Sequence, residues 1–422
     1  MEYNLKFHLD KDLPKPTKLK ENYLNDQVKY LATIPQHEQK SAEWYAMRQT
    51  MLSASDWGTI LGVNHYAKPD SVLLKKCGEE SFFPKAAMSA MAWGNKYEDV
   101  AISIYEHRNN KKILEFGCIR HPFIDFLGAS PDGISEDGVM LEIKCPVSRK
   151  ITGIPPEYYW CQVQGQLEVC ELDRCDFLEC KLKEYDDEEE YLEDNYEGNY
   201  ELNEYGHEKG VVAEFYIAKS EKYIYFYAPV NIIGDDLEKW KNEIREAHEI
   251  ITDNAKDNII LSSFDYWYLE EVSCVPIFRN QEWFNEAKLK LGDFWEEVLY
   301  YREMGLDFLK EELKNQKEEK KRIREEKREQ KKKEADSKKQ KKIKDFINLN
   351  DDSDENKHEH NKPENKPENK SDDSSEDNSV HNNIFDNVFG EDVINNNQDE
   401  DIIVLTTKKK ESQQVDFSNF EF

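Results

Sequence analysis

The spacing of apolar residues predicts an alternation of helices and strands between residues 41 and 305, with polar segments on either side. Helical spacing or helix-starting residues mark the segments 41–48, 53–62, 86–107, 155–169, 235–251 and 280–304. Strand-like segments are 113–117, 123–129, 140–146, 174–181, 210–217 and 222–229, and an aromatic segment at 264–269 is expected to be buried. This mixture predicts an α/β (α+β) protein in which helices flank a mixed central sheet.

The most informative stretch is a predicted hairpin in the first half of the chain. In a strand over residues 140–146, Glu142 and Lys144 lie two residues apart and therefore point to the same face. A three-residue loop at 136–138, in which Gly138 supplies a positive φ, would connect this strand to the residues before it. Counting along the resulting ladder places Asp132 directly opposite Glu142, with the two Cβ atoms about 5 Å apart.

Two facing carboxylates repel each other unless a cation lies between them. Oxygen ligands of this kind suit a hard divalent cation, and Lys144 adds a group that can handle protons. The combination is typical of metal-assisted hydrolysis of a phosphodiester. The residue pattern alone also permits a surface hairpin with solvated charges, because an aspartate followed by Glu-x-Lys is common by chance.

The segment Pro131-Asp132…Glu142-Ile143-Lys144 resembles the signature of the PD-(D/E)xK nucleases. Three further motifs occur in matching order along the chain: Glu43–Arg48 with Leu52–Gly62, Met91–Glu98, and Tyr158–Gln164. Together the four motifs resemble the YqaJ-type viral recombinases, the relatives of phage lambda exonuclease, over residues 41–182. The resemblance implies a restriction-endonuclease-like core, here followed by a helical C-terminal extension.

The resemblance also implies a metal site. Asp132 and Glu142 would bind Mg²⁺, with Mn²⁺ as a substitute, together with the backbone carbonyl of Ile143 and the carboxylate of Glu98 on a preceding helix. Lys144 would position or activate the attacking water, or neutralise charge in the transition state; the residues leave both roles open.

A predicted helix after Pro155 carries two further candidates. Tyr159 and Gln162 are three residues apart and share a face of that helix. The resemblance implies that this phenol and this amide border the metal site and orient the nucleophilic water and the scissile phosphate. Gln164 and Gln166 are expected to point elsewhere and receive no role.

Arg48 and Ser55 lie at the junction of the first two predicted helices. A guanidinium, a hydroxyl and helix N-terminal amides can form a phosphate pocket. A helix cap and a surface arginine are the structural alternative. The resemblance implies that these two residues hold the 5′-terminal phosphate of the resected strand.

The resemblance as a whole implies a Mg²⁺-dependent exodeoxyribonuclease that digests double-stranded DNA from its ends, 5′ to 3′, in viral-type recombination, repair or replication. It also implies a homotrimer that encircles DNA. One alternative is a structure- or sequence-specific endonuclease of the same fold, and another is a non-catalytic DNA-binding or scaffold protein.

The formal net charge of −30 contrasts with the lysine and arginine excess that phosphate binding normally needs. Much of the negative charge is concentrated in two places. Residues 183–209 hold 12 carboxylates and two lysines, and residues 346–401 hold 17 carboxylates and four lysines. These segments are expected to lie outside the substrate channel, so that any basic surface is local.

Composition divides the chain into four parts. Residues 1–40 are expected to form an extended N-terminal arm, and residues 41–305 a nuclease domain with a solvated or disordered acidic insertion at 183–209. Residues 306–345 form a charged, solvated helix, and residues 346–422 a disordered acidic tail. Short apolar patches in this tail could bind a single-strand annealing or replication protein.

Eight cysteines without a signal peptide or a long apolar run indicate a reduced, soluble, intracellular protein without a membrane span. If the protein is viral, the expected location is the host cytoplasm (viral factory) or the nucleus. Cys170, Cys175 and Cys180 recur every five residues, which raises the alternative of an iron–sulfur cluster. Since the spacing contains no C-x-x-C pair, ordinary buried cysteines are the preferred interpretation.

Overall fold

The computed structural model describes residues 15–79, 85–254 and 259–351. The described residues divide into two units, one that ends at Leu299 and one that begins at Tyr300. Each unit is considered by itself below.

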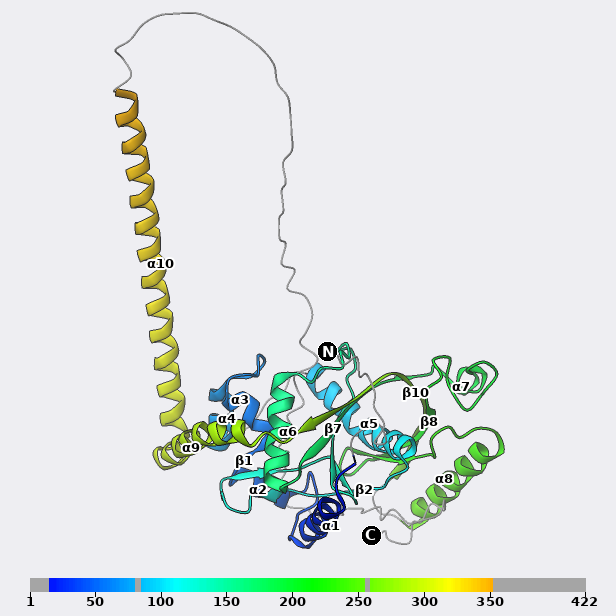
Figure 1. Ribbon diagram of the computed structural model, residues 1–422. Coiled ribbons are helices and arrows are strands. Elements are labelled where there is room, and N and C mark those ends of the chain that lie inside the picture. Colours follow the sequence, from blue (N-terminus) through cyan, green and yellow to red (C-terminus); the bar gives the residue numbers. More distant parts are fainter. Residues whose placement is uncertain (1–14, 80–84, 255–258, 352–422) are drawn as a thin grey trace, which may run out of the picture. The chain divides into compact units, whose positions relative to one another are not determined.

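A mixed sheet of seven strands forms the centre of the first unit in the order β2-β5-β6-β7-β10-β8-β9 (Figure 1). Its strands are β2 (Ile113–Leu114), β5 (Gly133–Ser135), β6 (Val139–Lys144), β7 (Arg174–Glu184), β8 (Lys209–Ile217), β9 (Lys222–Tyr227) and β10 (Ile259–Phe278). The β6–β7 pair is parallel and the other neighbours are antiparallel. A small sheet contains β1 (Leu52–Ser53), β3 (Ile119–Arg120) and β4 (Leu127–Ala129).

Ten helices are formed by the described residues. They are α1 (Lys18–Thr33), α2 (Ala42–Gln49), α3 (Ala54–Ile60), α4 (Pro69–Lys76), α5 (Lys85–Asn109), α6 (Glu157–Cys170), α7 (Glu188–Glu193), α8 (Gly234–Asn254), α9 (Gln281–Met304) and α10 (Leu306–Asp351). The predicted fold class, a mixed sheet flanked by helices with a helical C-terminal extension, is confirmed.

The sheet is covered on both faces, and β6 lies between two strands at its centre. Met140 of β6 packs in the same core cluster as α6, whereas Leu141 and Ile143 pack in the cluster that contains α5. Because side chains alternate along a strand, Glu142 lies on the α6 face together with Met140. This alternation explains how a strand that is buried along its whole length carries charged residues: they all point toward one helix.

Helices α3 and α6 cross in close contact through two glycines. A Cβ atom on Gly165 of α6 would lie 2.9 Å from the Cβ of Ala54, and one on Gly58 of α3 would lie 2.9 Å from the Cα of Tyr158. Both distances are shorter than van der Waals contact, so neither position accommodates a side chain without movement. The crossing fixes α3, which carries Ser55, against the helix that carries Gln162.

The expectation of an extended arm over residues 1–40 is wrong for residues 18–33, which form α1. Leu24, Val28 and Leu31 of this helix are buried in the core cluster that contains α6. Their spacing of four and three residues places them on one helical face, which explains why the helix docks. Residues 1–14 lie outside the described part of the chain.

The acidic insertion at 183–209 is ordered, contrary to the expectation of a solvated or disordered loop. Tyr191 of α7 is fully buried against the β8–β10 end of the sheet. The ammonium of Lys209 donates hydrogen bonds to the backbone carbonyls of Tyr191 (2.5 Å) and Asp194 (2.6 Å). Asn203 donates to the carbonyl of Leu269 (2.8 Å). These anchors hold the segment in place despite its charge.

The second half of the first unit agrees closely with the pattern of apolar positions. The predicted hairpin at 210–229 is β8–β9, and Leu237, Trp240 and Ile244 of α8 form its apolar cover. The predicted aromatic segment at 264–269 is the middle of the much longer strand β10. Of the predicted tail at 346–422, residues 346–351 belong to α10, and residues 352–422 lie outside the described part.

Candidate active site

The hairpin at the centre of the site has the register that was counted from the sequence. Gly133 pairs with Leu141 and Ile134 with Met140, so that Asp132 lies opposite Glu142. Gly138 has φ +81° in the connecting loop, and its N–H donates to the carbonyl of Ser135 (2.9 Å). The carboxylate of Asp132 accepts a hydrogen bond from the backbone N–H of Ile143 (2.6 Å), which fixes its orientation beside β6.

The carboxylate of Glu142 is fully buried and is held by three donors. Lys144 Nζ and Gln162 Nε2 lie 2.5 Å and 2.8 Å from one oxygen, and Gln166 Nε2 lies 2.6 Å from the other. The expectation that Gln166 points elsewhere is wrong. Gln162 and Gln166 are four residues apart, so they are neighbours on the helix face that covers the sheet. Gln164 does point away and bonds to the carbonyl of Phe278.

Lys144 lies between carboxylates and an aromatic ring. Its ammonium is 4.8 Å from the centre of the Tyr159 ring, a cation–π contact. Burial by itself lowers the pKa of Lys144, but the charges of Glu142 and Asp132 outweigh burial and raise that pKa well above its ordinary value. Asp132, Glu142, Lys144, Tyr159 and Gln162 are thus brought together on one face of the sheet.

Two residues that the sequence did not reveal border Lys144. Glu179 of β7 is paired with Lys144 in the parallel register of β6 and β7, and its carboxylate is buried. The guanidinium of Arg149 forms an ion pair with Glu179 (2.5 Å) and also faces the ring of Tyr159. Burial raises the pKa of Glu179, and the charge of Arg149 opposes that rise.

Glu98 lies on α5, the helix that covers the opposite face of the sheet. Glu98 and Asp132 both act on the Cys145 thiol. Burial raises the pKa of this thiol, and the charges of Cys180, Glu98 and Asp132 raise it further. Within the described ranges, no three His, Cys, Asp or Glu side chains form a metal-binding group. The role of Glu98 as a third acidic ligand therefore stays a prediction.

The donor set on the α6 face fits a magnesium ion. It consists of the carboxylates of Asp132 and Glu142, both of them oxygen donors. The backbone carbonyl of Ile143 stays a predicted ligand. Mg²⁺ typically uses one or two carboxylates together with substrate phosphate and water. In the structure, the ammonium of Lys144 provides the positive charge next to Glu142. The surroundings of this carboxylate are therefore already arranged for a cation.

Arg48 and Ser55 are joined directly. Arg48 Nη2 donates to Ser55 Oγ (2.9 Å), and Ser55 Oγ lies 3.3 Å from Ser53 Oγ. Arg48 is only 3% exposed and stacks on Trp44 with its guanidinium carbon 4.3 Å from the ring centre. It is therefore not a surface arginine, and the residue at the helix cap position is Ser53 rather than Ser55.

Two lysines of α4 that were not predicted from the sequence lie close to Ser55. Lys75 and Lys76 lie 3.3 Å and 3.1 Å from the two carboxylate oxygens of Asp56, which follows Ser55. Lys76 also donates to the backbone carbonyl of Arg48 (2.9 Å). The positive charges of Lys75, Lys76 and Arg48 all act on the carboxylate of Asp56. Burial lowers the pKa of Lys75 to about 7; Asp56 opposes this effect, while Lys76 and Arg48 add to it.

Comparison with known proteins identifies the segment that contains these residues. Residues 43–173 match the family described as the YqaJ-like viral recombinase domain. This segment is therefore similar to a YqaJ-like domain. It includes the donor set on the α6 face. It also includes the cluster formed by Arg48, Ser55, Asp56, Lys75 and Lys76.

The similar proteins with curated sequences are viral. An uncharacterized protein of Acanthamoeba polyphaga mimivirus is 33% identical over 343 residues, which are 73% of this chain and 62% of that protein. A protein of African swine fever virus is 26% identical over 163 residues, which are 31% of this chain and 46% of that protein. The chain thus spans less than two thirds of the length of these relatives.

Among solved structures, the chain is similar to an alkaline exonuclease from Laribacter hongkongensis, with 18% identity and a TM-score of 0.37. The match covers 65% of this chain and 99% of the exonuclease. A phage-related exonuclease from Haemophilus somnus is 12% identical with a TM-score of 0.34, over 60% of this chain and 96% of that one.

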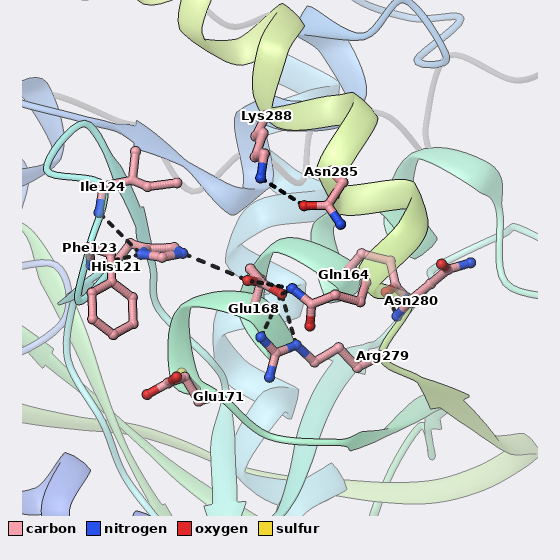
Figure 2. A network of polar contacts seen from close by, with 12 residues as sticks. His121, Phe123, Ile124, Gln164, Glu168, Glu171, Arg279, Asn280, Asn285 and Lys288 are labelled. Carbon is pink, nitrogen blue, oxygen red and sulfur yellow. Dashed lines mark hydrogen bonds and ion pairs between the residues drawn. The ribbon is translucent and has the colours of Figure 1, made fainter.

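A polar network fixes the end of α6 (Figure 2). Glu168 accepts a hydrogen bond from Arg279 Nε (2.8 Å) and lies 3.9 Å from His121 Nε2. His121 Nδ1 in turn accepts from the N–H groups of Phe123 and Ile124. Burial alone would raise the pKa of Glu168, but the neighbouring His121 and the hydrogen-bonded Arg279 hold it below its ordinary value. The network ties α6 to the loop before β4 and to the start of α9.

The regularly spaced cysteines belong to the core. Cys170 and Cys175 pack in the cluster with α6, and Cys180 packs in the cluster with α5. Burial raises the pKa of all three thiols. None of the helices in the described part of the chain combines the length and apolar character that crossing a bilayer requires.

Proposed function

We propose that this protein is a Mg²⁺-dependent exodeoxyribonuclease that degrades double-stranded DNA from its ends, 5′ to 3′, in viral-type DNA recombination, repair or replication. The observation that carries the proposal is the convergence of Asp132, Glu142 and Lys144 with Gln162 on one face of the sheet. The match of residues 43–173 to the YqaJ-like viral recombinase domain supports it.

Asp132, Glu142 and the carbonyl of Ile143 would hold the Mg²⁺ ion, with Glu98 as a further acid at the site. When bound, the ion polarises the scissile phosphate and lowers the pKa of the attacking water. Gln162 and Gln166 keep the Glu142 carboxylate in one orientation, because they donate to different oxygens. An oriented ligand does not have to rearrange when the metal and the phosphate arrive.

Lys144 and Tyr159 would act on the water and the phosphate. Lys144 contacts the carboxylate of Glu142 and faces the ring of Tyr159. In the proposed complex its ammonium would contact either Glu142, a proposed metal ligand, or the bound phosphate. In the proposed reaction it orients the water or neutralises the charge that develops on the phosphate.

The Arg48–Ser55 pair would select the DNA end. A guanidinium and a hydroxyl in direct contact offer donors to a terminal 5′-phosphate. Lys75 and Lys76 give this pocket an excess of positive charge over Asp56. Recognition of a 5′-phosphate gives the enzyme its polarity, because the bound strand is then cut from its 5′ end.

The test compares three DNA substrates in the presence of Mg²⁺: linear duplex with 5′-phosphate ends, linear duplex with 5′-hydroxyl ends, and closed circular duplex. We expect release of mononucleotides from the phosphorylated linear duplex, slower release from the hydroxyl form, and intact circles. Chelation of Mg²⁺ should stop the reaction. Cutting of closed circles would contradict the proposal and would favour an endonuclease of the same fold.

Lys144→Ala should reduce hydrolysis by at least about a hundredfold while duplex binding is retained. Lys150→Ala is the matched control, because Lys150 lies six residues away and is exposed. Full activity of Lys144→Ala would remove this lysine from the mechanism. The predicted homotrimer, the host location and the partner of the C-terminal segment stay predictions.

A further inference from the structure

The second unit contains a long helix whose charge pattern the proposed nuclease site does not explain. Every side chain of α10 between residues 314 and 340 is exposed. The residues of this stretch are almost all charged or amidic, with Ile323 and Ala335 as its apolar members. A helix of this kind has no apolar face that could pack into a core or insert into a membrane.

The charges of this stretch are segregated around the helix. Successive residues of an α-helix are rotated by about 100°. Between residues 320 and 339, this rotation places nine basic residues in a sector of about 140° without any acidic residue between them. This basic stripe consists of Lys320, Lys321, Arg324, Lys327, Arg328, Lys331, Lys332, Lys338 and Lys339. The rest of the circumference carries Glu325, Glu326, Glu329, Glu334 and Asp336 together with Arg322 and Lys333.

The basic residues on the two sides have different neighbours. Arg322, on the acidic side, forms an ion pair with Glu319 (2.7 Å). Within the basic stripe, the neighbours four residues apart carry like charges, as in Lys320 with Arg324 and Lys327 with Lys331. Such pairs destabilise an isolated helix by a few tenths of a kcal/mol each. A polyanion lying along the stripe would relieve this repulsion.

The dimensions of the stripe fit a duplex. From Lys320 to Lys338 the helix extends over about 27 Å. Along one strand of B-DNA, that length holds about eight phosphates. Two features therefore point to a nucleic acid rather than to a lipid surface: the length matches a repeating phosphate charge, and the helix has no apolar side.

We propose that the basic stripe of α10 is a sequence-independent binding surface for the phosphate backbone of duplex DNA. That the duplex is DNA rests on the proposed function. The stripe belongs to a different structural unit from the donor set of Asp132 and Glu142. It gives an acidic protein a local surface of the opposite charge.

The experiment uses the full chain and a fluorescent 30-base-pair duplex with Mg²⁺ chelated, so that binding is measured without hydrolysis. The test variant is Arg324→Gln with Lys331→Gln, both on the stripe. The control is Arg322→Gln with Lys333→Gln, which removes the same residue types on the opposite side. Glutamine preserves the helix propensity, and circular dichroism of each variant checks it.

The stripe variant should bind about tenfold more weakly in 0.1 M salt. Its slope of log affinity against log salt should fall by about 1.8, because each lost phosphate contact contributes about 0.9. The control should keep the slope of the unmodified protein. Equal effects of the two variants, or an unchanged slope in the stripe variant, would overturn the proposal.

Two further measurements separate this proposal from the proposed function. If linear duplex is not hydrolysed in Mg²⁺ but the stripe variant still loses binding, the nuclease assignment fails and the stripe stands. If hydrolysis proceeds and the stripe variant binds normally, the stripe assignment fails alone. Stripe-dependent binding to phosphatidylserine vesicles without stripe-dependent binding to duplex would overturn the choice of partner.

Discussion

At the scale of single residues, the Glu142 carboxylate depends on donors that come from two elements. Lys144 is on the same strand, whereas Gln162 and Gln166 come from α6. Gln166 also donates to the backbone carbonyl of Ser130 (3.3 Å), close to Asp132 in the chain. Gln166 therefore links the carboxylate of one predicted ligand to the backbone that leads to the other.

Gln166→Leu should lower both stability and metal affinity. A hydrogen bond to a charged group is worth about 1.5–3 kcal/mol, so the free energy of unfolding should fall by about 2 kcal/mol. Loss of a partner that orients a metal ligand weakens metal binding by about tenfold or more. Calorimetric titration with Mg²⁺ or Mn²⁺, without DNA, would measure the metal affinity, and thermal unfolding would measure the stability.

Gln164→Leu is the matched control for this change. Gln164 is equally buried on the same helix but contacts the backbone of Phe278 and Asn280. This variant should lose stability and keep its metal affinity. If both variants weakened metal binding alike, Gln166 would have only a structural role.

The residues of the site differ in how far they could be predicted. The pairing of Asp132 with Glu142 follows from local spacing, because the loop and both strands lie within about a dozen residues. Gln166 was predictable in principle from its distance of one helical turn to Gln162. Glu179 could not be predicted in this way. It lies beside Lys144 because β6 and β7 are parallel neighbours, and the register of a parallel pair is set by a long crossover connection rather than by a short turn.

At the scale of elements, α4 is the helix whose absence from the predictions matters most, because it supplies Lys75 and Lys76. Its start has a recognisable signal, Pro69 at the first helical position. The length of β10 had no such signal. Its first half pairs with β8 and its second half with β7, so its burial pattern changes along the strand and the regular alternation is lost.

The junction of α2, α3 and α4 predicts a pH dependence. The pKa of Lys75 is about 7 in the folded protein and 10.5 for an ordinary lysine, so its positive charge is present below pH 7 and lost as the pH rises through 7. Between pH 7 and 10.5, Lys75 is protonated in the unfolded chain but mostly neutral in the folded protein. Its contribution therefore makes the free energy of unfolding rise with pH in this range. Asp56, Lys76 and Arg48 are the charged groups that face it.

The preference for duplex with a 5′-phosphate over duplex with a 5′-hydroxyl should accordingly decrease between pH 6.5 and 8. The measurement is the ratio of the affinities for the two duplexes as a function of pH, without Mg²⁺ and at constant ionic strength. Lys75→Arg keeps the charge throughout this range and should flatten the curve. An identical pH dependence in this variant would exclude Lys75 as the titrating group.

At the scale of the whole molecule, charge of opposite sign is distributed in adjacent parts of the chain. The basic stripe of α10 is followed by residues 346–401, which hold 17 carboxylates and four lysines. A polyanionic segment tethered next to a cationic surface competes with any other polyanion at high effective concentration. The net charge of −30 is therefore a poor guide to DNA affinity, whereas the order of the charges along the chain is informative.

Removal of residues 352–422 should strengthen duplex binding by several fold in 0.05 M salt. The gain should shrink above about 0.3 M salt, because screening shortens the range of the charges. The same truncation in the Arg324→Gln, Lys331→Gln variant gives a double-mutant cycle. If the acidic residues act on the stripe, the gain in that background should be clearly smaller. A gain of equal size in both backgrounds would show that the segment acts through the overall charge of the protein and not through α10.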